Sequence, residues 1–499
     1  MAVELYERLG FTKSPFSTFS AEEELEFLKD VFVEPLYFSS IESEIKDGHS
    51  RFILGARGIG KTALILRLKE NIDSLNTFSV IIDDFDGIPS KNNKSKFLQT
   101  MLERLVRDFC FTLAKDPSLL KKLNGIEKEK LAFIIKEFFR TISKKEYEKF
   151  YDKATNYKNR NFARRIFNSV FNKPINLFIS GGVELVSDAV RKSLGLPDAN
   201  STNFFKSYVP ELKLEEIERE KKTKALFSDS KVIKEVIYDL AQLIQKCGLG
   251  KPVVFFDKID EYSVLNSNIK NIAEFLEEVL KDTALLLNQN LALVFSVWDA
   301  LKPELAARGV RFDKIKPLDI TWSDGDLKRI LDKRFDHFSG GKITHDVIIR
   351  NNADFQGIIS LASNSPRYLF RLLSVIYDQQ NNNNPSANYI ETDNILVGKR
   401  IFSQTFDFYA AFPGKRGTKE DILTNINRLL RIGKSTIRTQ DFVEVFKVST
   451  PTGINYIAIN KDYGFLVESS DIDGKAKIYN ITNPIILNLI ANEVPELRK

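Results

Sequence analysis

The stretch of sequence that decides the fold is Gly55-Ala56-Arg57-Gly58-Ile59-Gly60-Lys61-Thr62, which matches the pattern G-x-x-x-x-G-K-T in full. A short apolar segment, 50–54, precedes it, and residues 63–69 have helical character. In such a loop the glycines let backbone N–H groups face phosphate oxygens, and the helix N-terminus adds partial positive charge. The order of these segments predicts a strand, a phosphate-binding loop (P-loop) and a helix that together bind ATP.

Three residues at the end of this stretch are expected to act on the nucleotide or lie against it. Lys61 offers a mobile positive charge to the β and γ phosphate oxygens, and the Thr62 hydroxyl is suited to ligate Mg²⁺. Ala63 begins the helix beside the phosphates. The alternative is an incidental glycine-rich turn, but the flanking strand and helix favour the phosphate loop.

A second motif places acidic residues directly after an apolar segment, 253–256. Asp257 follows this segment and is expected to hold Mg²⁺ through water. Asp260 and Glu261 are both candidates to orient or deprotonate the attacking water, and the sequence leaves open which of them is the base. The alternative is an acidic turn between a strand and a helix, where Asp and Glu are common caps.

Apolar runs without alternation, separated by helical segments, predict a parallel sheet covered on both faces. We expect its strands at 50–54, 78–82, 253–256, 291–297 and 316–321. The interval between the second and third strands is far longer than a crossover needs and is mostly helical in pattern. Helical segments are expected at 98–113 and 127–142, followed by a basic and aromatic stretch at 144–165.

The C-terminal part reads as helices, then a polar loop, then a small domain. Helices are expected from near Asp324 and at 368–377, and the run 379–385 is too polar to pack. The last elements are expected to be helices at 422–431 and 439–446, strands at 465–468 and 475–479, and a helix at 483–491. The order helix, helix, hairpin is that of a winged helix.

The predicted fold class is therefore α/β, with a parallel-sheet P-loop NTPase core, a large helical insertion, an all-α lid and a C-terminal winged-helix domain. The predicted boundaries are 1–90 and 250–323 for the core, 91–249 for the insertion, 324–415 for the lid and 416–499 for the winged helix.

Composition narrows the chemistry. The chain has only two cysteines, Cys110 and Cys247, and three histidines. Because these residues are so few, a disulfide framework, a thiolate zinc site and histidine catalysis are improbable. The net charge of +6 permits contact with nucleic acid without requiring it. The sequence shows neither a signal peptide nor an apolar run of the ~20 residues that a membrane helix needs. We expect a cytoplasmic protein with no membrane partner.

These motifs resemble those of the AAA+ ATPases and their STAND-type relatives, especially the origin-recognition-like group in prokaryotes. The resemblance covers most of the chain outside 91–249, and the order Asp257-x-apolar-Asp260-Glu261 is closer to the STAND type. It implies ATP and Mg²⁺ as cofactors, a homo-oligomer, and a site between the core and the helical lid. It also implies that Pro15 and Phe16 cover the adenine.

Three further motifs follow in the order that the resemblance implies. Asp299, after the fourth strand, stands where the family has a polar sensor of the γ-phosphate, although asparagine is commoner there. Arg308 and Arg311 precede the fifth strand, where the family supplies an arginine finger to a neighbouring subunit. Arg367 corresponds to a second sensor in the lid. Solvated arginines and an ordinary helix start are the alternatives.

Two surfaces are candidates for double-stranded DNA. The winged helix carries basic residues interleaved with acids, and its role as a protein contact is an equal alternative. Its basic residues are Lys434, Arg438, Lys475 and Lys477. The insertion offers Arg160, Arg164 and Arg165, for which an ordinary solvated helix face is the alternative.

Two functions are consistent with these residues. The first is an ATP-hydrolysing, oligomeric switch or motor that acts on DNA or on an effector protein, in genome maintenance or antiphage defence by family analogy. The second is a signalling or scaffold module that holds ATP or ADP with little turnover.

Overall fold

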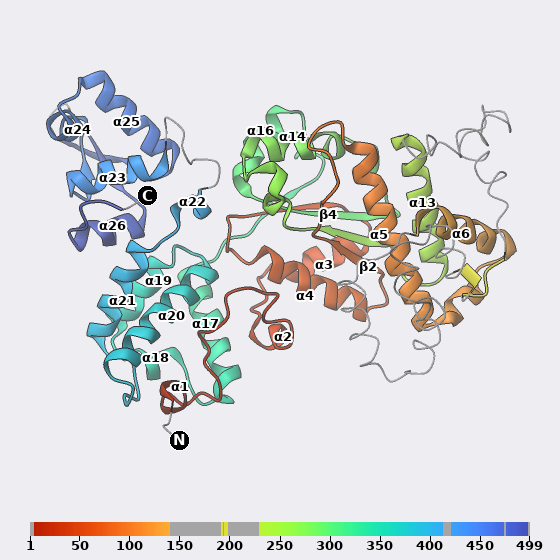
Figure 1. Cartoon of the computed structure of the whole chain (residues 1–499), viewed down its shortest axis with the longest axis horizontal. Coiled ribbons are helices and arrows are strands. Elements are labelled where there is room, and N and C mark those ends of the chain that lie inside the picture. The colour runs from red at the N-terminus through yellow and green to blue at the C-terminus, as the bar shows by residue number, and fades with distance from the viewer. Residues whose placement is uncertain are drawn as a thin grey trace. The chain divides into compact units, whose positions relative to one another are not determined.

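The computed structural model describes residues 4–139, 191–192, 194–197, 229–412, 421–473 and 476–497 (Figure 1). They form two compact units. Unit 1 comprises Met1–Pro35, Gly55–Arg67 and Asp319–Lys499, and unit 2 comprises Leu36–Leu54 and Leu68–Leu318. The P-loop therefore belongs to the same unit as the N-terminal segment and the C-terminal third.

Unit 2 is built on a five-stranded sheet with the strand order β2-β3-β4-β1-β5. The strands are β1 (Arg51–Leu54), β2 (Ser79–Ile82), β3 (Val253–Phe256), β4 (Ala292–Val297) and β5 (Pro317–Asp319). The pairs β1–β4, β2–β3 and β3–β4 are parallel. The parallel sheet is confirmed, and all five strands lie where the apolar runs predict them.

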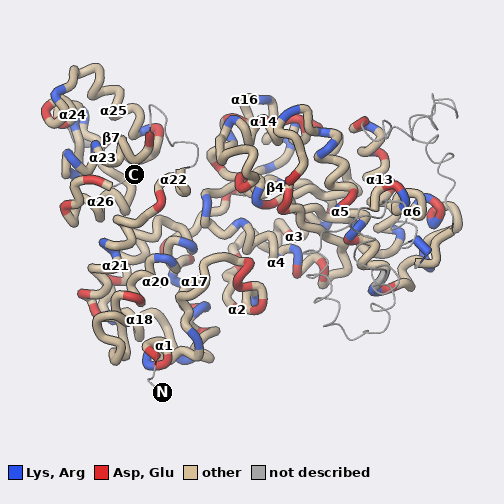
Figure 2. Tube along the Cα trace, in the orientation of Figure 1, with Lys and Arg blue, Asp and Glu red and all other residues tan. Residues whose placement is uncertain are grey.

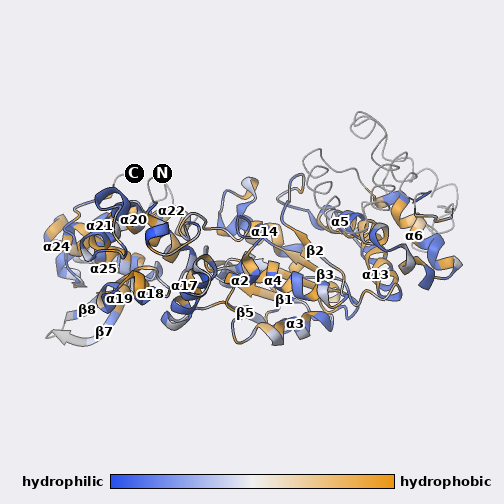
Figure 3. Cartoon of the chain, turned by 90° about the horizontal axis from the view of Figure 1, so that it is seen from below, coloured by the Kyte–Doolittle hydropathy of each residue, from blue (hydrophilic) through white to orange (hydrophobic). Residues whose placement is uncertain are grey.

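The strands are apolar on both faces because helices cover the sheet. Every residue of β3 and β4 is buried, and Figure 3 shows hydrophobic residues along the strands of this sheet. One core cluster joins the strands to the helices α5 (Lys94–Lys115), α6 (Gly125–Phe138), α13 (Ser230–Lys246) and α14 (Ile269–Leu280). The described helices of the predicted insertion thus share the core of the sheet.

The other helices among the described residues of unit 2 are short. They are α3 (Phe38–Lys46), α15 (Thr283–Leu286), α16 (Lys302–Ala307) and the 3₁₀ helices η1 (Pro117–Lys122), η3 (Ile259–Glu261), η4 (Ser263–Leu265) and η5 (Asp299–Leu301). The helix after the P-loop, α4, runs from Lys61 to Ser74.

Unit 1 is helical up to residue 412. Its helices are α1 (Leu5–Arg8), α2 (Leu28–Val31), α17 (Asp324–Ser339), α18 (His345–Ile348), α19 (Asn352–Leu361), α20 (Pro366–Asn383), α21 (Thr392–Gln404) and α22 (Phe408–Ala411). The N-cap of α17 is Ser323, and Asp324 is its first helical residue. The helical lid that the sequence predicts is present in this unit.

The acidic run 21–31 is mostly turn rather than helix. Only Leu28–Val31 is α-helical, and residues 21–27 are turns. The carboxylate of Glu23 accepts hydrogen bonds from the backbone N–H groups of Phe19 and Ser20, 3.2 Å from each nitrogen. Side chains that bond the preceding backbone in this way stabilise turns at the expense of helix.

The C-terminal elements are α23 (Ile422–Ile432), β6 (Thr436–Ile437), α24 (Thr439–Phe446), α25 (Thr450–Asp462), β7 (Leu466–Asp473), β8 (Ala476–Ile481) and α26 (Pro484–Ala491). The strands form an antiparallel sheet in the order β6-β8-β7. Helix, strand, helix, helix, hairpin is the order of a winged helix. The sequence reading missed α25 because its buried face consists of Gly453, Ile457 and Asn460, which lack an apolar period.

The polar run 379–385 is also different from its prediction as a loop. Helix α20 continues to Asn383, and Gln380 is completely buried. The amide oxygen of Gln380 accepts from the backbone N–H of Glu391 and from Asn394 Nδ2, both at 2.8 Å. Its amide nitrogen donates to the Asn384 carbonyl oxygen at 3.1 Å. A polar run can pack when its amides satisfy one another.

We predict that Gln380→Ala lowers the free energy of unfolding by about 1–3 kcal/mol, because Asn394 and Glu391 lose their buried partner. The matched control is Asn382→Ala, two residues away on the same helix but exposed. Its effect should stay within about 0.5 kcal/mol. Urea denaturation of both variants checks this, and equal losses would contradict a structural role for the amide cluster.

Candidate functional site

The P-loop has a backbone that glycine alone adopts readily. Gly58 has a φ of 80° and Gly60 a φ of 98°, both in the left-handed region. A Cβ atom at Gly58 would also lie 3.1 Å from Arg367 Cβ and 3.1 Å from Ser365 Oγ. The ammonium of Lys61 donates to the carbonyl oxygens of Gly55 and Ala56, at 2.8 and 3.0 Å. The glycines thus determine the backbone conformation of the loop, and the Lys61 ammonium is hydrogen-bonded to the loop's own carbonyl oxygens.

The start of helix α20 contacts this loop. Ser365 is its N-cap, and the Ser365 hydroxyl donates to the Gly58 carbonyl oxygen at 3.2 Å. The backbone N–H of Arg367 donates to the same oxygen at 3.4 Å. Helix α20 therefore begins at Pro366, and Arg367 lies beside the P-loop. Its role as a sensor of the γ-phosphate stays a prediction.

A tryptophan holds the next residue of the loop. The indole N–H of Trp322 donates to the Ile59 carbonyl oxygen at 2.7 Å, and the bond is buried. Trp322 directly precedes the cap of α17. Consecutive P-loop carbonyls, those of Gly58 and Ile59, are thus bound by two different helical segments of unit 1.

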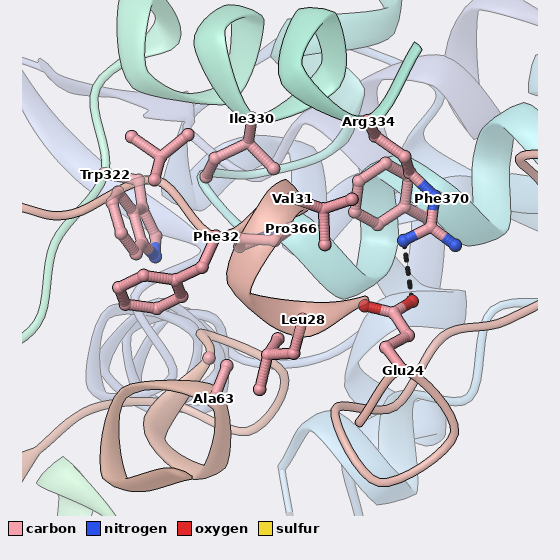
Figure 4. A pocket seen from close by; sticks show the side chains of 12 residues that line it. Glu24, Leu28, Val31, Phe32, Ala63, Trp322, Ile330, Arg334, Pro366 and Phe370 are labelled. Carbon is pink, nitrogen blue, oxygen red and sulfur yellow. Dashed lines mark hydrogen bonds and ion pairs between the residues drawn. The ribbon is translucent and has the colours of Figure 1, made fainter. Parts of the chain in front are cut away.

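A pocket with about 500 Å³ of empty space, part of it open to solvent, lies beside the end of the P-loop (Figure 4). Most of its wall is apolar, as is typical of a site for a flat ring system. The lining residues are Glu24, Leu28, Val31, Phe32, Val33, Gly60, Ala63, Trp322, Ile330, Arg334, Pro366 and Phe370. Gly60 and Ala63 come from the phosphate-binding stretch, so a base in this pocket would be adjacent to the phosphates.

Arg334 binds the N-terminal segment to helix α17. Its guanidinium is 1% exposed and forms an ion pair of 2.6 Å with Glu24. It also donates to the Pro15 carbonyl oxygen at 2.6 Å and to the carbonyl and hydroxyl oxygens of Thr18 at 3.1 and 2.7 Å. Burial lowers the pKa of Arg334, and the charge of Glu24 opposes this shift. One buried charge therefore orders residues 15–24.

Pro15 and Phe16 lie next to this pair. Phe16 is 2% exposed and packs on Phe11, Phe335 and Tyr377. Neither Pro15 nor Phe16 lines the pocket. Their role in covering adenine stays a prediction, and the segment that does line the pocket comes later, at 24–33.

The sequence reading missed the pocket residues Glu24, Phe32, Trp322, Arg334 and Phe370. Arg334 carried a usable signal, because it falls on the apolar face of α17 beside Leu331, Phe335 and Phe338, all buried. A charged residue on such a face needs a buried partner. Nothing in the sequence identifies that partner as Glu24, 310 residues away.

The acidic motif lies in unit 2. Asp257 follows β3 and is 4% exposed, and its backbone N–H donates to the Ile82 carbonyl oxygen at 3.0 Å. Asp260 is 8% exposed and Glu261 is exposed, both within η3. Asp299 follows the neighbouring strand β4 and is exposed. The carboxyl ends of parallel strands meet at one sheet edge, where α/β folds bind ligands.

The donor chemistry fits the predicted magnesium ion. Mg²⁺ takes one or two protein oxygen ligands together with phosphates and waters. The Thr62 hydroxyl and the Asp257 carboxylate are ligands of this kind. Within the described ranges no group of three or more His, Cys, Asp or Glu side chains is placed to hold a metal by itself.

Both candidate arginine fingers form ion pairs within unit 2. Arg308 contacts Glu277 at 2.8 Å and Glu304 at 2.9 Å, and Glu277 raises the pKa of Arg308. Arg311 makes two bonds to Asp313, at 2.8 and 2.6 Å, and lowers the pKa of that carboxyl to about 2. Either arginine would have to exchange these partners to act on a neighbour's nucleotide, and their role stays a prediction.

Two basic residues of the predicted winged helix also form ion pairs. Lys434 contacts Asp441 at 2.5 Å, and Lys477 contacts Glu468 at 2.7 Å. Figure 2 shows acidic and basic residues interspersed over these elements. Arg438 caps α24, while Lys475 and the insertion residues Arg160, Arg164 and Arg165 lie outside the described residues. Among the helices that are described, none is long and apolar enough to span a membrane.

A G-x-x-x-x-G-K-T loop between β1 and α4 of a parallel sheet defines the fold class as that of the P-loop NTPases. No protein-family model matches the chain. No curated protein matches it either.

Solved structures that resemble the chain include the ORC1 protein of Aeropyrum pernix in complex with DNA, with a TM-score of 0.35, 12% identity and coverage of 94% of each chain. The ORC2 protein of the same organism, in ADPNP and ADP complexes, has a TM-score of 0.38 and 10% identity over 98% of each chain. A Walker-type ATPase of Pyrococcus abyssi has a TM-score of 0.36 and 12% identity over 95% of this chain and 96% of its own. Two of these structures are ORC proteins, and the motifs of this chain resemble the same origin-recognition-like group. At this identity and TM-score they carry no argument about activity.

We predict that Arg334→Met lowers the free energy of unfolding by about 3–5 kcal/mol, because it leaves the Glu24 carboxylate buried without its cation. Arg329→Met is the control on the same helix, since Arg329 is 58% exposed in its surface pair with Asp326. Its cost should be at most about 1 kcal/mol. Denaturant unfolding of the two variants measures the difference, and similar values would show that the Arg334 bonds do not order this unit.

Proposed function

We propose that the chain binds ATP with Mg²⁺ through 55–62 and hydrolyses it, as an AAA+/STAND-like switch or motor. The observation that carries this proposal is the P-loop itself, with left-handed Gly58 and Gly60 directly beside an apolar pocket. A nucleotide needs a polar site for its phosphates directly beside an apolar site for its base. Unit 1 offers both side by side, because Gly60 and Ala63 of the phosphate-binding stretch also line the pocket.

In this proposal different residues bind the phosphates, hold the metal ion, orient the attacking water and sense the γ-phosphate. The backbone N–H groups of the loop hold the phosphates, and Lys61 neutralises their charge. Thr62 and Asp257 would hold Mg²⁺, which would supply positive charge to the phosphates. Asp260 or Glu261 orients the attacking water. Asp299 and Arg367 sense the γ-phosphate.

The lid is the proposed means of output. Because Ser365 and Trp322 hold the carbonyls of Gly58 and Ile59, a rearrangement of the loop on hydrolysis would be transmitted to α20 and α17. We propose that the chain oligomerises, with Arg308 or Arg311 completing a neighbour's site. Its target would be DNA or an effector protein in the cytoplasm, in genome maintenance or antiphage defence.

The direct test is the rate of magnesium-dependent phosphate release. We expect Lys61→Ala and Asp257→Ala to lower the rate about 100-fold or more, because each removes charge stabilisation at the transferring phosphoryl group. Lys270→Ala, which removes an exposed lysine of α14, should keep the wild-type rate. Wild-type turnover no greater than that of either site variant would sink the proposal.

A second candidate function is a signalling or scaffold module that holds nucleotide with little turnover. The bonds from Ser365, Arg367 and Trp322 to the loop carbonyls favour it, because they hold the loop and the lid together. A site closed in this way would release nucleotide slowly.

For this second function we expect purified protein to retain close to stoichiometric ADP, and Trp322→Phe to release it faster because the bond to Ile59 is lost. Chromatography of the nucleotide freed by acid denaturation measures the content. Protein that elutes empty and turns over ATP continuously would rule the module out in favour of the ATPase.

A further inference from the structure

The pocket beside the P-loop has a side-chain hydrogen-bond acceptor in its wall. Its polar lining residues are Glu24, Trp322 and Arg334. The indole N–H of Trp322 is directed to the Ile59 carbonyl oxygen, and Arg334 donates to Pro15, Thr18 and Glu24. The Glu24 carboxylate is the one side chain of the three that offers acceptor oxygens.

The two oxygens of this carboxylate are not equivalent. Oε1 accepts from Arg334 Nη1 at 2.6 Å and from the Thr18 hydroxyl at 3.0 Å. Within the described part of the chain, both side-chain hydrogen bonds of Glu24 thus end on Oε1. Figure 4 shows the other oxygen turned away from Arg334, toward the side of the pocket where Leu28 and Ala63 lie. Because Glu24 lines the pocket and Oε1 is bonded to Arg334 and Thr18, Oε2 is the oxygen that remains for a ligand there.

Burial makes this orientation significant. The Glu24 side chain is 10% exposed, and its partner Arg334 is 1% exposed. The ion pair with Arg334 and the hydrogen bond from Thr18 both end on Oε1 and hold the orientation of the carboxylate. A fixed acceptor in an apolar wall favours a ligand that presents an N–H donor there and disfavours one that presents a carbonyl.

We infer that Glu24 Oε2 accepts a hydrogen bond from the 6-amino group of the nucleotide base, so that Glu24 selects adenine over 6-oxopurines. This inference rests on the proposed nucleotide binding and assigns its base specificity to one residue. Because Oε1 is occupied, the site offers one acceptor, which matches the single exocyclic amine of adenine. A two-point bond to the N1–H and 2-amino groups of guanine would need both oxygens.

The test measures dissociation constants of ATP, ITP, GTP and purine riboside triphosphate, which lacks the 6-amino group. We expect wild-type protein to bind ATP about 10- to 100-fold more tightly than the other three. Glu24→Gln should reverse the preference between ATP and ITP. The amide oxygen of the glutamine would keep the bonds to Arg334 and Thr18, which turns its NH₂ group, a donor, toward the base.

Glu26→Gln is the matched control, because Glu26 is an exposed carboxylate two residues away that does not line the pocket. Its ratio of ATP to ITP affinity should equal that of wild type. Thermal unfolding of each variant verifies that it is folded, and 2′-deoxyATP tests whether Glu24 reads the ribose instead.

Several outcomes would overturn the inference. They are an unchanged ATP to ITP ratio in Glu24→Gln, tighter binding of GTP than of ATP by wild type, or a Glu24 effect that depends on the 2′-hydroxyl. In each of these cases ATP binding itself survives, and the proposed function stands. Wild-type protein that binds no nucleotide would overturn both.

Discussion

The burial of one permanently charged side chain organises the first unit. A guanidinium cannot lose its proton at neutral pH, so removing Arg334 from water requires acceptors for its N–H groups. Glu24, Thr18 and the Pro15 carbonyl provide them, all from the N-terminal segment. Residues 15–24 are therefore held against α17, although they lie about 310 positions earlier in the sequence. The wall of the pocket, from Glu24 to Val33, follows from that anchoring.

The P-loop depends on a different constraint, the backbone angles of Gly58 and Gly60. Side chains at these positions would be strained, and at Gly58 they would also meet Ser365 and Arg367. The glycines thus serve twice. They shape a loop for phosphate, and they allow the lid helix α20 to approach the backbone closely enough to bond it. The loop and helix α20 are thus linked by direct hydrogen bonds.

Local patterns predicted much of the fold. Strand β3 and helix α24 have the bounds that their apolar patterns indicate, because the residues that determine them are adjacent in sequence. Helix α25 and the end of α20 were missed, since Asn460 and Gln380 are buried amides whose partners no periodicity reveals. The P-loop was evident from spacing alone. The Glu24–Arg334 pair was not, because a contact across 310 residues leaves no local signal.

The position of Trp322 also has a spectroscopic consequence. The chain contains two tryptophans, and Trp322 lines the pocket with its indole N–H bonded to the P-loop. The other, Trp298, is buried in unit 2 between β4 and Asp299. Indole emission responds to the polarity and hydrogen bonding of its surroundings. The chain thus has an intrinsic fluorophore at its pocket, against a second one fixed in the core, and changes at the loop can be followed in time without a label.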